Sequence, residues 1–198
     1  MLYVMEMNEL HTPSNKDTVR SIFKEIIQFA LIAAFIVLPF RLFIAQPFIV
    51  NGASMDPTFA SGEYLIVDQI SYHFNHPSRG SVLIFKYPED PSKYFIKRVI
   101  GLPSETVQIH NGNVTITNRD YPNGLLLDEP YIEFPKKDSI EVSLTDDEYF
   151  VMGDNRLGSS DSRAWGPVKS EYLIGRPVVR LFPLEKLSIL PGAVHINE

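Results

Sequence analysis

The sequence predicts a mainly β protein: one N-terminal transmembrane helix, then an antiparallel β-sheet or partial barrel that carries a smaller lobe with a β-hairpin. Three observations predict this fold class. A long apolar run lies near the N-terminus, short runs of β-branched and aromatic residues follow it, and no convincing long amphipathic helix pattern appears after residue 50. The length of 198 residues suits one packed domain with a small lobe.

The apolar run covers residues 26–40, with Gln28 its one strongly polar residue. As a helix it would rise only about 22 Å, short of a hydrocarbon core of about 30 Å. Apolar residues resume after Arg41, so we expect a membrane anchor over residues 21–44 with Lys24 and Arg41 reaching opposite interfaces. A buried core helix and a cleaved signal peptide are the alternatives, but the run lacks the regular polar positions of the first and the small-residue cleavage site of the second.

Basic residues are more frequent before the apolar run than after it. Three basic residues precede the apolar run: Lys16, Arg20 and Lys24. After the run, Arg41 is the only Lys or Arg before Arg79. This asymmetry predicts that residues 1–20 are cytoplasmic and that residues 45–198 form an extracytoplasmic domain, in a single-pass protein of the plasma membrane. We expect Pro39 to kink or end the helix.

Short strands are predicted through the exported domain, at residues 64–67, 81–85, 94–100 and 149–152. The clearest local prediction is a two-residue type I′ hairpin, because Asn111-Gly112 lies between two alternating arms. Residues from about 106 to 142 are more polar than the strands on either side, which indicates a small inserted β lobe.

Composition excludes several classes of function. The net charge is −6 and no run of Lys or Arg occurs, which argues against nucleic acid as the main partner. Cys is absent, so disulfides, thiol nucleophiles and cysteine-ligated metal sites are excluded. The five histidines lie outside any motif, and we expect no metal and no cofactor. The sequence does not specify an oligomeric state.

Ser54 is the first candidate for chemistry. It lies in a turn between Gly52 and Pro57, whose rigid backbone can present a hydroxyl. Turns of this composition are common, so the residues by themselves leave an ordinary surface turn open. A serine nucleophile also needs a base.

Lys97 is the second candidate, in a predicted strand where it shares a face with Phe95 and Val99. An apolar environment disfavours the ammonium, so it lowers the pKa of a lysine and yields a neutral amine that can act as a base. A lysine on an edge strand with its amine in water is the alternative.

The third candidate is the stretch of residues 153–166, which follows an apolar strand and precedes the single Trp. Its charged residues are Asp154, Arg156, Asp161 and Arg163. Because two arginines would oppose a cation, we expect a buried Asp–Arg network beside a site rather than a metal site. A solvated polar loop is the alternative.

In this order, the three stretches resemble the conserved boxes of the type I signal peptidases, which are membrane-anchored serine proteases with a Ser-Lys dyad. Residues 54–58 (SMDPT) resemble the nucleophile box, residues 97–103 (KRVIGLP) the lysine box, and residues 153–163 (GDNRLGSSDSR) the C-terminal box. Arg79-Gly80 and the apolar residues after it resemble the remaining box. The resemblance runs from the anchor to about residue 177.

The resemblance implies a role for each matched residue. Ser54 would attack the substrate carbonyl, Lys97 would be the base, and Ser159 would orient the lysine amine. Asp161 and Arg163 would form a supporting ion pair, and Asp154 would be a further structural acid. Met55 would pack near the pocket, and the Ser54 backbone N–H would help to hold the oxyanion.

Three positions depart from the family pattern. Gly52 stands where some members carry a serine that assists the oxyanion, and a glycine has no hydroxyl to take that role. Ser81 stands where an aspartate is frequent, and Ser104 where a glycine is frequent.

The resemblance implies an endopeptidase that removes signal peptides from exported preproteins after small-x-small sites such as Ala-x-Ala. Its expected partners are those preproteins and membrane lipid, with no nucleic acid. Two alternatives stay open: a Ser-Lys peptidase for one dedicated precursor, and an anchored β-domain that binds exported peptides without cutting them.

Overall fold

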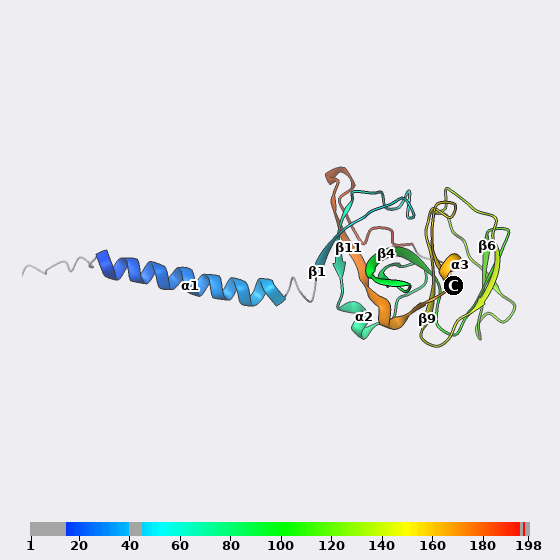
Figure 1. Cartoon of the computed structure of the whole chain (residues 1–198), viewed down its shortest axis with the longest axis horizontal. Coiled ribbons are helices and arrows are strands. Elements are labelled where there is room, and N and C mark those ends of the chain that lie inside the picture. The colour runs from blue at the N-terminus through cyan, green and yellow to red at the C-terminus, as the bar shows by residue number, and fades with distance from the viewer. Residues whose placement is uncertain (1–14, 40–44, 195, 197–198) are drawn as a thin grey trace, which may run out of the picture. The chain divides into compact units, whose positions relative to one another are not determined.

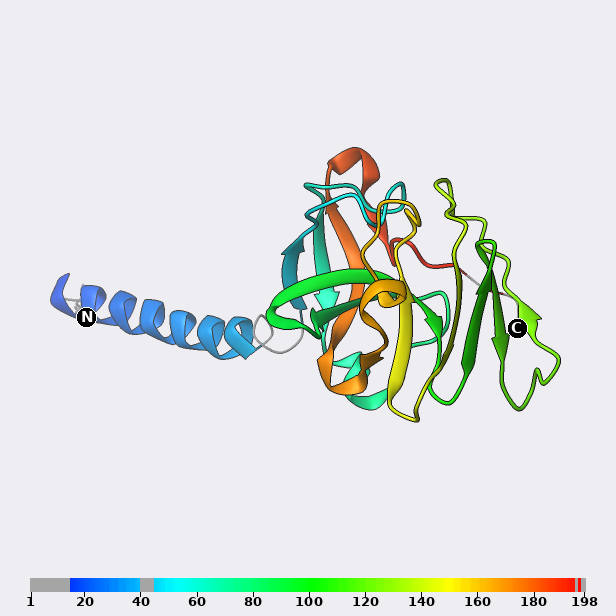
Figure 2. The ribbon, with the colours of Figure 1, turned by 45° about the vertical axis from the view of Figure 1, so that its right-hand side comes forward.

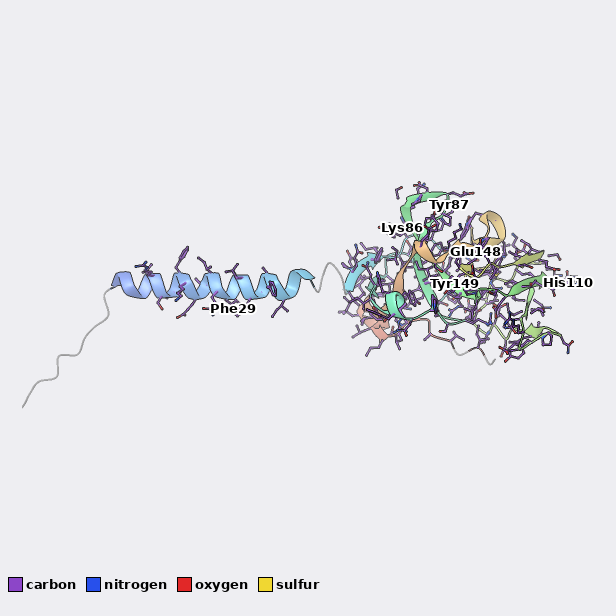
Figure 3. All side chains as sticks on the ribbon, turned by 90° about the horizontal axis from the view of Figure 1, so that it is seen from below. Phe29, Lys86, Tyr87, His110, Glu148 and Tyr149 are labelled. Atoms are coloured by element: carbon purple, nitrogen blue, oxygen red, sulfur yellow. The ribbon has the colours of Figure 1, made fainter. Side chains whose placement is uncertain are left out.

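The computed structural model describes residues 15–39, 45–194 and 196. The chain divides into two units, Met1–Arg41 and Leu42–Glu198. The described part of the first unit is helix α1 (Asn15–Pro39), and the residues that directly follow Pro39 lie outside the described residues. Phe29 projects from this helix (Figure 3). Within the described residues, none of the helices combines the length and the apolar character needed to cross a membrane. Residues 40–44 of the expected anchor lie outside the described residues.

Antiparallel strands form the second unit, so the mainly β prediction is confirmed (Figure 1). The larger sheet has eight strands in the order β1-β2-β11-β3-β4-β9-β10, with β12 paired to β11. This path is open, so the sheet is not a closed barrel. Its strands are β1 (Ala45–Ile49), β2 (Tyr64–Asp68), β3 (Val82–Tyr87), β4 (Asp90–Gly101), β9 (Glu148–Met152), β10 (Val168–Lys169), β11 (Leu173–Phe182) and β12 (Ser188–Ile189).

A second sheet has four strands in the order β7-β6-β5-β8. Its strands lie together beside β9 in both views (Figures 1 and 2). They are β5 (Thr106–His110), β6 (Asn113–Thr117), β7 (Leu125–Leu126) and β8 (Ser139–Ser143), and the short helices of the unit are α2 (Ser71–Phe74), α3 (Ser162–Trp165), η2 (Ser170–Tyr172) and η3 (Leu184–Lys186).

The predicted hairpin is present between β5 and β6. His110 pairs with Asn113, and the two turn residues Asn111 and Gly112 have φ values of 52° and 87°. Positive φ at both positions is the type I′ geometry, whose twist matches that of the flanking strands. The four other predicted strands also form, as β2, β3, β4 and β9.

Strands β1 and β11 were not predicted. Both contain proline, Pro47 and Pro177, and β11 also contains Gly175. Proline removes a hydrogen-bond donor from a strand, and it usually marks an edge or an irregularity. The pairing of β11 with β2 shifts register between Pro177 and Val179, so β11 accommodates its proline at an irregularity.

Three apolar clusters form the core. One cluster joins the two sheets, since it includes Ile100 and Phe150 of the larger sheet with Val107 and Ile116 of the smaller one. The other two lie on opposite faces of β3: Val82 and Ile84 belong to one, and Leu83 and Phe85 to the other. The first of these also holds Met55 and Phe59, so it supports the turn that contains Ser54.

Candidate active site

The topology brings Ser54 and Lys97 together. Ser54 lies in the loop between β1 and β2, and Lys97 lies on β4. Lys97 Nζ is 2.8 Å from Ser54 Oγ, which is hydrogen-bond distance. The two residues are 43 positions apart in the sequence, and this contact gives a serine hydroxyl a neighbouring amine that can act as its base.

The environment of Lys97 favours the neutral amine. Its side chain is buried, with 4% of its surface exposed, and Nζ lies 5.3 Å from the centre of the Phe95 ring. Burial lowers the pKa of Lys97 from 10.5 to about 8, although the charges of Asp161 and Asp154 oppose the shift. Nζ also donates a hydrogen bond to the Ile96 carbonyl (3.0 Å), which fixes its direction.

The loop after β9 packs directly on the Ser54 turn. The Asn155 backbone N–H donates to the Ser54 carbonyl (3.1 Å), and its side-chain amide donates to the Ala53 carbonyl (3.0 Å). A Cβ atom on Gly153 would lie 2.3 Å from both the Ser54 carbonyl oxygen and Ser159 Oγ, so a larger residue at this position would displace one of them. Asn155 belongs to the quoted motif, but no role was predicted for it.

Ser159 lies beside this glycine, with its hydroxyl oxygen buried. Among the described residues that oxygen has no hydrogen-bond partner at standard geometry, so it is not hydrogen-bonded to Lys97. The hydroxyl is close enough to Asp161 to help lower the pKa of that carboxyl.

Asp161 and Arg163 form an ion pair, with Arg163 Nε 2.8 Å from Asp161 Oδ1. The Asp161 carboxylate also accepts a hydrogen bond from the Gly153 backbone N–H (3.0 Å). Burial raises the pKa of Asp161, but the Arg163 guanidinium and the Gly153 N–H more than offset it, so the pKa lies below its usual range. Asp161 is therefore ionised at neutral pH.

Asp154 is completely buried and is paired with Arg98, the residue that follows Lys97. Arg98 donates to both oxygens of this carboxylate, at 2.8 and 2.6 Å, and Thr58 donates its hydroxyl at 2.5 Å. The other terminal nitrogen of Arg98, Nη1, donates hydrogen bonds to the carbonyls of Gly80 and Gly192, both at 2.7 Å. This network ties the nucleophile turn, β4 and the loop after β9 to one another.

Met55 and Gly52 flank the nucleophile. Met55 is buried in the cluster with Phe59 and Leu65, beneath the turn. Gly52 has a φ of 101°, a conformation that side chains rarely adopt. A serine there would have open space but a strained backbone, which agrees with a glycine at this position of the chain.

Ser81 and Ser104 are the two other positions that depart from the family pattern. Ser81 donates its hydroxyl to the Ser78 carbonyl (2.6 Å). Ser104 has a φ of 65°, the left-handed conformation that a glycine would adopt without strain.

Several partners of the motif arginines were not anticipated from the sequence. Arg79 forms a two-pronged ion pair with Glu105, at 2.7 and 2.8 Å. Arg156 pairs with Glu129 in the same manner. An Asp–Arg network was expected only within residues 153–166. The chain offers 24 acidic residues, and spacing does not distinguish among them.

A shallow apolar hollow is lined in part by residues that precede the dyad residues in the sequence. It is lined by residues of β1, β2, β3 and β4 and by Val50, just before the nucleophile turn. Its lining includes Phe95 and Ile96, the two residues before Lys97. The apolar lining of the hollow suits small apolar side chains.

Comparison with known proteins shows the family of this chain. The family model described as "Signal peptidase, peptidase S26" matches residues 23–182. The chain belongs to the signal peptidase family. It is 39% identical to the probable signal peptidase I-1 of Synechocystis sp. over 188 residues, which cover 88% of this chain and 93% of that protein.

Other signal peptidases show the same relation. Signal peptidase I of Leptolyngbya laminosa is 42% identical over 158 residues, covering 76% of this chain and 75% of that protein. A crystal structure of a signal peptidase I from Enterococcus faecalis is 28% identical and covers 52% of this chain and 97% of that chain, with a TM-score of 0.45. The resemblance read from the three boxes is confirmed, and the chain is a peptidase of this family.

Proposed function

We propose that this chain removes signal peptides from exported preproteins by a Ser-Lys mechanism, with Ser54 as nucleophile and Lys97 as base. The observation that carries the proposal is the 2.8 Å contact between Ser54 Oγ and a buried lysine amine with a lowered pKa. Family membership supplies the substrate class, since the relatives are named signal peptidases.

The reaction proceeds in two steps. The neutral Lys97 amine takes the proton of the Ser54 hydroxyl as Oγ attacks the scissile carbonyl, and it then gives that proton to the leaving amine. Water attacks the resulting acyl-enzyme, with the same amine as base, and releases the signal peptide. The Ser54 backbone N–H stabilises the oxyanion.

The substrate binds as an extended strand. Residues 94–97 of β4 pair with β3 on one side, whereas β9 pairs on the other side with residues of β4 from Arg98 onward. Among the described residues no strand pairs with this second edge of residues 94–97. A peptide that pairs there gains backbone hydrogen bonds, and its alternate side chains enter the apolar hollow. The shallow hollow favours alanine and other small residues at the cleavage site.

Cleavage of a precursor with an Ala-x-Ala site tests this proposal. The full chain in detergent is incubated with the precursor, and mass spectrometry locates the new terminus. We expect cleavage after the second alanine, and none by Ser54→Ala. Ser92→Ala, at an exposed serine near the start of β4, is the control and should cleave at the wild-type rate. A Ser54→Ala variant that still cleaves would exclude the proposed nucleophile. A folded wild type that cleaves only one dedicated precursor would support the specialised peptidase instead.

We also propose the membrane arrangement expected from the sequence: residues 1–20 cytoplasmic, an anchor over residues 21–44, and residues 45–198 as the extracytoplasmic catalytic domain. The apolar run of residues 26–40 supports the anchor, and the large apolar side chains of α1 are exposed, with Phe29 and Phe35 more than three-quarters so. A second exposed apolar group lies around η3 and β12: Leu184, Leu187 and Ile189. These side chains would contact lipid.

Extraction of reconstituted vesicles with alkaline carbonate tests the anchor. The full chain should stay with the lipid, because carbonate removes only peripherally bound protein. The double variant Leu31→Asp/Phe35→Asp should be released, since each aspartate costs about 3 kcal/mol at the centre of a membrane helix. Release of the wild type would contradict the arrangement.

A further inference from the structure

A single segment contacts every arginine of the lysine box and the C-terminal box. Residues 127–138 connect β7 with β8, and the sequence places them in a polar lobe apart from the motifs. In the structure this segment supplies one partner to each of three arginines: Glu129 to Arg156, Tyr131 to Arg98, and Asp138 to Arg163. We refer to residues 127–138 as the bridging segment.

Glu129 is connected to the nucleophile through two residues, Arg156 and Gly153. The carboxylate of Glu129 binds both terminal nitrogens of Arg156, and both side chains are almost completely buried. Arg156 Nε donates to the Gly153 carbonyl (3.1 Å). Gly153 packs against both the Ser54 carbonyl and the Ser159 hydroxyl, so the position of Arg156 determines how closely these groups approach.

Tyr131 covers the residue next to the base. Its ring lies 4.0 Å from the guanidinium carbon of Arg98, and its hydroxyl donates to Glu129 (2.7 Å). Burial and the Glu129 carboxylate raise the pKa of Tyr131, so the hydroxyl is protonated and remains a donor. Arg98 in turn fixes the end of β4 that carries Lys97 through its bonds to Asp154 and Gly80.

Asp138 is the third of these partners, and its carboxylate binds a terminal nitrogen of the Arg163 guanidinium. Arg163 bridges Asp138 and Asp161 and also donates to the Arg156 carbonyl (2.8 Å). The Asp138 backbone carbonyl accepts from the Gly112 N–H (3.3 Å), which connects this contact to the β5–β6 hairpin turn. A polar pocket lined by Asp138, Ser159, Asp161 and Arg163 lies between the segment and the catalytic loop.

We infer that the bridging segment is a positioning element of the active site, in which Glu129, Tyr131 and Asp138 hold the motif arginines and thereby fix the distance between Ser54 and Lys97. The inference rests on the proposed function, because it concerns the residues that hold that site. These residues touch neither the nucleophile nor the base, so their loss affects the chemical step through geometry. A displacement of about 1 Å at a reacting group can lower a rate about 100-fold.

The test compares kinetic constants of full-length variants in detergent, normalised to the concentration of active sites titrated with a serine-acylating reagent. Glu129→Gln and Asp138→Asn should each lower kcat per active site about tenfold or more, with KM within about twofold of the wild type. Glu133→Gln removes an exposed carboxylate of the same segment and should match the wild type. Tyr131→Phe keeps the ring over Arg98 and should retain more than half of kcat, whereas Tyr131→Leu should lose as much as Glu129→Gln.

Normalisation to active sites separates positioning from simple loss of folded protein. A purely structural role would lower the number of titrated sites and leave kcat per site unchanged, and that result would overturn the inference. Equal kcat values for Tyr131→Phe and Tyr131→Leu would also overturn it. If the folded wild type cleaves no Ala-x-Ala precursor, the proposed function fails instead, and the two failures are thus distinguished.

Discussion

Replacement of Lys97 by alanine is expected to lower kcat/KM for a precursor by about 10⁴-fold or more. The reason is that the Lys97 amine is the basic group within hydrogen-bond distance of Ser54 Oγ, and members of a catalytic nucleophile–base pair act as a unit. The measurement is the rate of precursor cleavage under single-turnover conditions. The variant should remain folded, because it removes a buried amine whose charged form is costly in an apolar environment.

The matched control is Lys93→Ala, on the same strand. Lys93 is well exposed and forms a surface ion pair with Asp90. Such pairs contribute little to stability, so this variant should cleave at the wild-type rate. A Lys97→Ala variant with more than a tenth of wild-type activity would show that another group takes the proton of Ser54.

The second large effect is expected on stability, from replacement of Asp154 by alanine. This change leaves the Arg98 guanidinium completely buried without its carboxylate, and it removes the acceptor of the Thr58 hydroxyl. Loss of one partner of a buried ion pair costs about 3–5 kcal/mol. We expect the midpoint of thermal unfolding to fall by roughly 10 °C.

Calorimetry of the full chain in detergent measures this shift. Asp90→Ala serves as the control, because it removes a carboxylate from an ion pair that is largely exposed to solvent. An unfolding midpoint for Asp154→Ala within 2 °C of the wild type, roughly the effect of 1 kcal/mol or less, would mean that the network around Arg98 contributes little to stability.

The turn and the strands that were predicted correctly from the sequence are specified by short stretches of neighbouring residues. The Asn111-Gly112 turn follows from two residues that tolerate positive φ, and β2, β3, β4 and β9 follow from short apolar runs between turn residues. Strand β11 has no such signal, because Gly175 and Pro177 interrupt it. Its place beside β2 and β3 comes from tertiary pairing that overrides local preference.

Within the candidate site, the sequence predicted only the residues that belong to the motifs. The order of the boxes predicted that Ser54, Lys97 and the loop after β9 come together, and the 2.8 Å contact agrees with that expectation. The partners Glu105, Glu129, Tyr131 and Asp138 lie outside the boxes, 25 to 33 residues from the arginine that each contacts. Each could pair with several arginines, and the choice depends on how the second sheet packs on the first.

The pH dependence of Ser54 acylation tests the central claim most directly. That claim is that a neutral, buried Lys97 activates Ser54. The rate at which a serine-acylating reagent modifies the wild-type chain is followed by intact mass from pH 6 to pH 10. Because the lowered pKa of Lys97 is about 8, the rate should rise about tenfold per pH unit below that value and level off above it. A rate that is constant across this range would contradict the account.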